Sequence, residues 1–193
     1  MSKIYIINSS KKFDFAEGRL NDALTEIARK ILSDSGHEVK TIRIDDGYTV
    51  EEEIHRYLWA DSIFYQTPTW WMEGPWILKR YIDEVFTGGA GVLYKNDGRT
   101  RSDPDKKYGS GGLLQGRTYM ISSTWNAPAE AFEDRNQLFE GRGVDAPYYA
   151  LHRANMFIGL SPLPSFMCND VVKQPQHEQD VERLARHLKQ LYG

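Results

Sequence analysis

Three of the five tryptophans of this chain lie within seven residues, in the segment Trp70-Trp71-Met72-Glu73-Gly74-Pro75-Trp76. The segment directly follows Ser62-Ile63-Phe64-Tyr65, an apolar run typical of a buried strand. Ligands of open α/β sheets bind outside the carboxyl ends of the strands, so the aromatic residues are well placed to stack on a planar cofactor. Tryptophans are also common core residues. Taken alone, the cluster is compatible with either role.

The loop after the first apolar run, residues 8–18, lacks the known nucleotide-binding fingerprints. It contains neither the G-x-G-x-x-G turn of dinucleotide-binding dehydrogenases nor the P-loop pattern. It offers hydroxyl groups, Lys11, Lys12 and a glycine, Gly18, just before a helical pattern. Hydroxyls, positive charge and the N–H groups of a helix N-terminus can bind phosphate.

Hydrolytic and metal chemistry have little support in the sequence. There is no G-x-S-x-G motif, and the histidines show no metal-ligand spacing: His37, His55, His152, His177 and His187. Cys168 is expected to be a small buried residue in a strand rather than a nucleophile. The acidic run Glu51-Glu52-Glu53 is expected to be a solvated helix start. We therefore predict no metal site and no catalytic side chain.

Composition predicts a single soluble domain over residues 1–193. Apolar residues make up 40% and charged residues 26% of the chain, which is ordinary for a globular protein. A net charge of −3 argues against a nucleic-acid partner. The single cysteine excludes an internal disulfide and fits a reducing compartment. The first residues do not form a signal segment and no apolar run is long enough to span a membrane, so a cytoplasmic location is expected.

Apolar periodicity predicts strands that alternate with helices. Strands are expected at 4–7, 37–44, 61–66, 118–122 and 166–168, and helices at 20–32, 50–59, 75–86, 150–158 and 181–192. The charges interleaved in the second strand favour the edge of a sheet. With right-handed crossovers, these units predict a flavodoxin-like three-layer α/β sandwich, a five-stranded parallel sheet in the order 2-1-3-4-5 with helices on both faces.

Two stretches do not fit the alternation. Residues 88–116 are rich in glycine and are expected to form one long loop insertion, of the kind that is often functional. Tyr108 in this loop could close over a bound ring or could be an ordinary surface tyrosine. Residues 126–143 have no clean period and are expected to contain a partial helix around 128–132.

Several segments together resemble one known family. They are Pro68-Thr69-Trp70-Trp71-Met72, Ile77-Leu78-Lys79-Arg80-Tyr81-Ile82-Asp83-Glu84-Val85-Phe86, Asp97-Gly98-Arg99-Thr100, Lys107-Tyr108-Gly109-Ser110-Gly111-Gly112 and Thr124-Trp125-Asn126-Ala127-Pro128. The chain is similar to the NADPH:quinone reductases of the modulator of drug activity B type, within the flavodoxin-like NAD(P)H dehydrogenase (quinone) family. The resemblance implies bound FAD, NADPH or NADH as co-substrate, a quinone acceptor and a homodimer.

The resemblance also assigns cofactor-binding residues by position. It places the phosphates and adenosine of FAD at Ala16, Glu17, Gly18, Arg19, Leu20, Asn21, Asp22 and Ala23. It places the isoalloxazine ring against Thr69, Trp70, Trp71 and Met72, with further contacts from Tyr108, Thr124, Trp125, Asn126 and Ala127. These segments follow the first, third and fourth expected strands. Animal members of the wider family have Gly-Gly after the fourth strand and a Tyr and His near the flavin; Trp125-Asn126 replaces the glycines here, so that relay is not implied.

The expected mechanism is two-electron transfer from NADPH through the flavin to a quinone, in a ping-pong cycle. The flavin carries the chemistry, and the backbone N–H groups near Trp71 and Met72 are candidates to hydrogen-bond its N5 and ring carbonyls. Two alternatives remain. A flavin-dependent azo or nitro reductase would share the site, and an FMN electron carrier would share the fold, although such carriers are generally more acidic and lack so long a loop.

Overall fold

The computed structural model describes residues 1–14 and 16–193; Phe15, in the loop after the first strand, lies outside the described residues. The elements are listed here in chain order: β1 Lys3–Asn8, α1 Arg19–Asp34, β2 Glu38–Arg43, a 3₁₀ turn Ile44–Asp46, α2 Val50–Trp59, β3 Ser62–Pro68, α3 Trp76–Gly88, β4 Thr118–Thr124, α4 Glu130–Glu133, α5 Tyr149–Phe157, β5 Ser161–Pro162, β6 Phe166–Cys168 and α6 His177–Tyr192.

The strands form one parallel sheet, which confirms the predicted flavodoxin-like order. From the β2 edge the order is β2-β1-β3-β4, and both β5 and β6 then pair with β4. The sequence predicted only the β6 part of the fifth position. Pro162 and Pro164 explain the division, because a proline has no N–H to donate to a sheet ladder.

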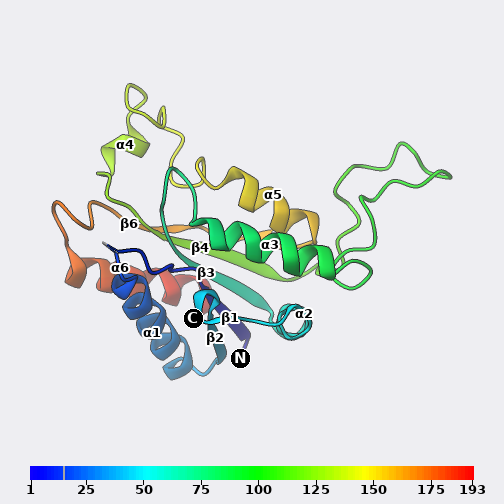
Figure 1. Cartoon of the computed structure of the whole chain (residues 1–193), viewed down its shortest axis with the longest axis horizontal. Coiled ribbons are helices and arrows are strands. Elements are labelled where there is room, and N and C mark those ends of the chain that lie inside the picture. The colour runs from blue at the N-terminus through cyan, green and yellow to red at the C-terminus, as the bar shows by residue number, and fades with distance from the viewer. Residues whose placement is uncertain (15) are drawn as a thin grey trace.

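The sheet separates two apolar layers, as Figure 1 shows with α1 and α6 on one side and α3 and α5 on the other. On the first side, side chains such as Ile6 and Phe64 pack with Leu24 of α1 and Leu184 of α6. The opposite layer is built from the alternate strand residues and from α2, α3 and α5. Alternation along the central strands therefore supplies both cores, and β1, β3 and β4 are buried on both faces.

One buried carboxylate corrects the interpretation of the acidic run. Glu51 and Glu52 are exposed, but Glu53 is fully buried. Its Oε2 accepts hydrogen bonds from the Tyr5 hydroxyl at 2.5 Å and the Tyr81 hydroxyl at 2.6 Å. The Arg56 guanidinium donates to Oε1 at 2.7 Å. The helical period turns the third glutamate toward the sheet, where these donors compensate its charge.

Residues between α3 and β4 form the long loop, and none of those from 90 to 117 belongs to a helix or a strand. Leu93 and Leu114 are buried and anchor the two ends of the loop to the core. The middle of the loop extends away from the body of the molecule, at the right of Figure 1.

Two helices can be compared with their predicted bounds. Pro75 was predicted to be the first helical residue, but it directly precedes α3, a shift of one position at a helix boundary. The partial helix expected around 128–132 is the short helix α4. Among the described residues, no helix is both long and apolar enough to cross a membrane.

Candidate functional site

A cleft of about 580 Å³ opens at the carboxyl ends of β1, β3 and β4, which is within the usual size range of small-molecule sites. Ten of the residues predicted to bind a cofactor line it: Ala16, Glu17, Gly18, Arg19, Leu20, Asn21, Thr69, Trp70, Thr124 and Asn126. Four lining residues were not in the predicted set: Lys11, Pro68, Val171 and Val172. The two valines follow β6 in a segment without any period that could have identified them.

Gly18 shapes the phosphate end of the cleft. It directly precedes α1 and has a left-handed backbone with φ of +81°. A Cβ at this position would lie only 2.9 Å from the Cβ of Ser10, so a larger residue would displace the loop. The first N–H groups of α1 have no partners within the helix and carry the positive end of its dipole. The bare backbone at Gly18 therefore suits close approach of an anion.

Asp22 holds this loop from behind rather than lining the cleft. Its Oδ1 accepts hydrogen bonds from Asn8 Nδ2 at 2.7 Å and Ser10 Oγ at 2.9 Å. Its other oxygen lies 3.5 Å from the Arg43 guanidinium. The Asp22 charge is thus paired inside the loop, away from the bound phosphates that the resemblance implies. Ala23, also in the predicted set, is exposed and outside the cleft lining.

Lys11 is the cation of the loop that lines the cleft. Its ammonium lies 2.8 Å from Asp45 Oδ1. Partial burial raises the pKa of the Asp45 carboxyl, but the hydrogen bonds from the Lys11 ammonium and from the Lys12 N–H lower it by more. The pKa is therefore below its ordinary value. Asp45 therefore stays ionised and keeps Lys11 at the cleft.

A chain of buried amides and a hydroxyl adjoins the cleft, and two of its three members, Asn21 and Thr124, line it. Gln66 Nε2 donates to Asn21 Oδ1 at 2.8 Å, and Asn21 Nδ2 donates to Thr124 Oγ1 at 3.1 Å. The three side chains join β3, α1 and β4, and Gln66 Oε1 is buried without a partner in the described part of the chain. The sequence analysis missed Gln66. A glutamine at the end of an otherwise apolar strand was the available signal.

Trp70, the first residue of the turn Trp70–Glu73, supplies the aromatic wall of the cleft. Trp70 lines the cleft, and its ring centroid lies 4.2 Å from that of Phe13. Trp71 and Met72 have positive φ values of 48° and 73°, which are rare for residues other than glycine. Trp71 is 93% exposed, so it is not a core residue. Among the described residues, the N–H groups of Trp71 and Met72 donate no hydrogen bond to the protein.

Five other predicted residues are outside the cleft lining: Trp71, Met72, Tyr108, Trp125 and Ala127. Trp125 is buried, packs edge-on against Phe132, and donates its indole N–H to Ser123 Oγ at 3.1 Å. Ala127 packs against the same core cluster. Tyr108 lies on the long loop, 66% exposed, with its ring 5.7 Å from that of Phe157 on α5. It lines a separate hollow and does not reach the cleft of its own chain.

His152 and Cys168 are both buried, and their contacts are those of residues that support the fold. His152 is buried and its Nδ1 lies 2.7 Å from the Tyr119 hydroxyl, with Nε2 3.2 Å from Asp145. Burial, with a further contribution from Asp180, raises the pKa of the Cys168 thiol to about 12, so the thiol is neutral. No group of three or more potential metal ligands occurs among the residues described.

Comparison with known proteins identifies the class. The model of the family with a flavodoxin-like fold matches residues 2–191, so the chain belongs to this family. Within it, the chain is 48% identical over 190 residues to the NADPH:quinone oxidoreductase MdaB of Haemophilus influenzae, covering 98% of this chain and 99% of that protein. The resemblance proposed from the sequence motifs is confirmed.

Solved structures share the fold at lower identity. The crystal structure of a putative quinone reductase from Klebsiella pneumoniae superposes with a TM-score of 0.78 at 21% identity, over 100% of this chain and 85% of that one. The general stress protein 14 of Treponema denticola, solved with FMN, has a TM-score of 0.69 at 18% identity. The superposition covers 100% of this chain and 98% of that one.

Proposed function

We propose that the chain is an FAD-dependent NAD(P)H:quinone oxidoreductase. The observation that carries this proposal is the cleft itself. It is bordered by the N-terminus of α1, with the bare backbone of Gly18, and by Trp70, the first residue of the Trp70–Glu73 turn. A phosphate-binding end and a stacking wall in one cleft fit a flavin nucleotide. The high identity to a quinone oxidoreductase over nearly the whole chain supports the activity.

Different residues of the cleft would bind different parts of the flavin nucleotide. Bound FAD would supply the redox chemistry, since a flavin accepts a hydride and passes on two electrons. The α1 N-terminus and Lys11 would bind its phosphates, and Trp70 would cover its ring. The free N–H groups of Trp71 and Met72 would donate to the ring's nitrogen and carbonyl acceptors. The Gln66–Asn21–Thr124 chain would keep α1 in register with the sheet.

We expect the purified protein to be yellow and to release FAD when denatured. The absorption spectrum of the native protein and mass measurement of the released compound test this directly. Release of FMN would instead favour the smaller flavin, as in the FMN-bound structure with the same fold. A colourless protein that takes up neither added flavin would overturn the proposal.

We also expect NADPH and the quinone to take turns at the site. Both would need the same face of one flavin ring beside Trp70, so they would not be bound together. Initial rates with varied NADPH at several menadione concentrations should give parallel double-reciprocal lines. Intersecting lines would show a ternary complex with two separate sites and would contradict the mechanism.

The homodimer is part of the proposal. Trp76 on α3 and Tyr149 and Met156 on α5 are 57%, 64% and 37% exposed, and Tyr108 of the long loop packs against Phe157 on α5. We call this surface the α3–α5 face. A second copy could bury it, and the flavin contact implied for Tyr108 would then be made in the partner's cleft. Sedimentation should give a dimer at micromolar concentration, and a species near 22.3 kDa would contradict it.

A further inference from the structure

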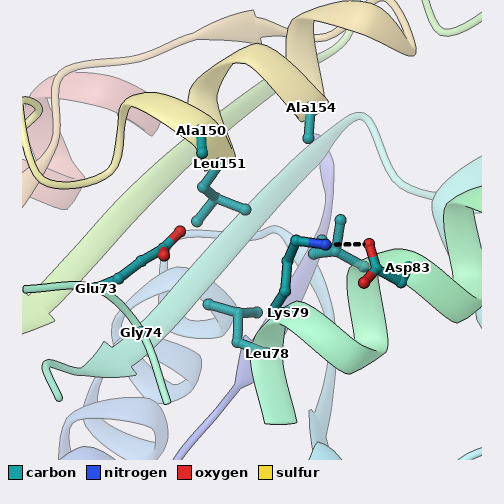
Figure 2. Close-up of a pocket in the computed structure, with 9 residues that line it drawn as sticks. Glu73, Gly74, Leu78, Lys79, Asp83, Ala150, Leu151 and Ala154 are labelled. Atoms are coloured by element: carbon teal, nitrogen blue, oxygen red, sulfur yellow. Dashed lines mark hydrogen bonds and ion pairs between the residues drawn. The ribbon is translucent and has the colours of Figure 1, made fainter. Parts of the chain in front are cut away.

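A second hollow lies between α3 and α5, on the other side of the aromatic turn. Its volume is about 140 Å³, and its floor is made of the buried side chains Leu78, Ile82 and Leu151. Figure 2 shows Leu78 reaching in from α3 and Leu151 from α5, with Ala150 and Ala154 on the α5 wall. Larger side chains at these two alanines would occupy the space. We call it the α3–α5 pocket.

The chemistry of the α3–α5 pocket selects an uncharged ligand group. Lys79 and Asp83 stand at its rim, but they form an ion pair with each other, marked in Figure 2, and so offer no net charge. Glu73 adds a carboxylate at the mouth, which would repel an anion. An apolar cavity of about 150 Å³ stays dry and can bind a benzene-sized molecule. The pocket therefore suits a short hydrocarbon group.

The α3–α5 pocket is joined to the proposed flavin cleft through a single turn. Trp70 lines the cleft and Glu73 lines the pocket. The Trp70 N–H donates to the Glu73 carbonyl at 2.7 Å, and the Glu73 N–H donates back to the Trp70 carbonyl at 3.3 Å. Gly74 continues the pocket wall, where a Cβ would lie 2.6 Å from Leu78 Cδ2. A molecule with its ring beside Trp70 could thus extend over the turn into the pocket.

We propose that the α3–α5 pocket binds the apolar tail of the quinone acceptor, so that the enzyme favours quinones with an isoprenoid substituent. This inference rests on the proposed function. It assigns tail recognition to Leu78, Leu151, Ala150 and Ala154, residues that do not line the flavin cleft. The head group would stay at the aromatic wall.

The test compares ubiquinone-0 with ubiquinone-1, which share a head group and differ by one isoprenoid unit. Each buried methylene contributes about a fourfold gain in binding, so partial burial of the unit should lower KM for ubiquinone-1 roughly tenfold. Ala154→Leu, which fills the pocket, should remove this advantage and leave ubiquinone-0 kinetics and flavin content unchanged. Ala90→Leu, at an exposed position just beyond α3, is the matched control.

Ala150→Leu provides a second variant, because Ala150 is exposed and the change should not impair folding. The inference is overturned if wild-type protein shows equal KM values for the two quinones, or if both pocket variants keep the wild-type ratio. The pocket lies on the same helices as the α3–α5 face, so in the proposed homodimer the tail would lie beside the second copy, and sedimentation of each variant is measured as well. Loss of the dimer with an unchanged ratio would overturn the inference and show that the pocket receives the second copy instead. Absence of activity with ubiquinone-0 as well would refute the proposed function rather than the tail site alone.

Discussion

Glu53→Ala is expected to lower the free energy of unfolding by about 3–5 kcal/mol, the usual effect of breaking a buried charged network. The substitution removes the acceptor of the Tyr5 and Tyr81 hydroxyls and of the Arg56 guanidinium. The two tyrosine hydroxyls would then be left without an acceptor in a fully buried region, whereas Arg56 is partly exposed. Burial first, and then the Glu53 charge, raises the pKa of Tyr5, so the tyrosine stays a neutral donor throughout the physiological range. Urea denaturation gives the measurement.

Glu52→Ala is the matched control for that experiment. Glu52 precedes Glu53 on α2 and is exposed, so its removal should change the free energy of unfolding by less than about 0.5 kcal/mol. If the two variants are equally stable, the hydrogen bonds around Glu53 contribute nothing measurable, and the acidic run is no more than a charged helix start.

Trp71→Ala is expected to weaken flavin binding by about 1–3 kcal/mol, the scale of a lost aromatic stack. Because Trp71 is 93% exposed, the loss of its side chain should leave the melting temperature of the flavin-free protein nearly unchanged. Titration of the flavin-free protein with FAD, followed by fluorescence, measures the affinity.

Trp59→Ala separates a binding role from a packing role. Trp59 ends α2, packs against the core, and has the Lys40 ammonium 4.2 Å from its ring centre. Its removal should lower the melting temperature with little effect on flavin affinity. If both variants weaken flavin binding equally, the aromatic turn has no special relation to the cofactor.

Much of the architecture could be predicted because the central strands β1, β3 and β4 are buried on both faces. Continuous apolar runs such as residues 4–7 leave few other assignments, and the charged residues of β2 indicated its edge position. The short strand β5 could not be found, since two residues carry no period. The burial of Glu53 could not be predicted from the sequence either, because its partner Tyr5 lies 48 positions earlier in the chain.

The candidate site shows a similar division. Segments at strand ends could be placed in one crevice, since the carboxyl ends of parallel strands meet at one edge. The direction in which each single side chain points could not be predicted. Asp22 turns toward Ser10, and Trp125 turns into the core beside Phe132. Tyr108 depends on where a long loop packs, and its contact with Phe157 is a tertiary contact without a local pattern.

The two borders of the sheet bear on how the protein behaves when concentrated. Unpaired strand edges are templates for aggregation, and charge, proline and interruption each prevent it. β2 carries Glu38, Lys40 and Arg43 along one border. The opposite border is broken into β5 and β6 around Pro162 and Pro164. Neither border can readily add a strand from another molecule, so amyloid-like growth is disfavoured and specific assembly is left to the helical faces.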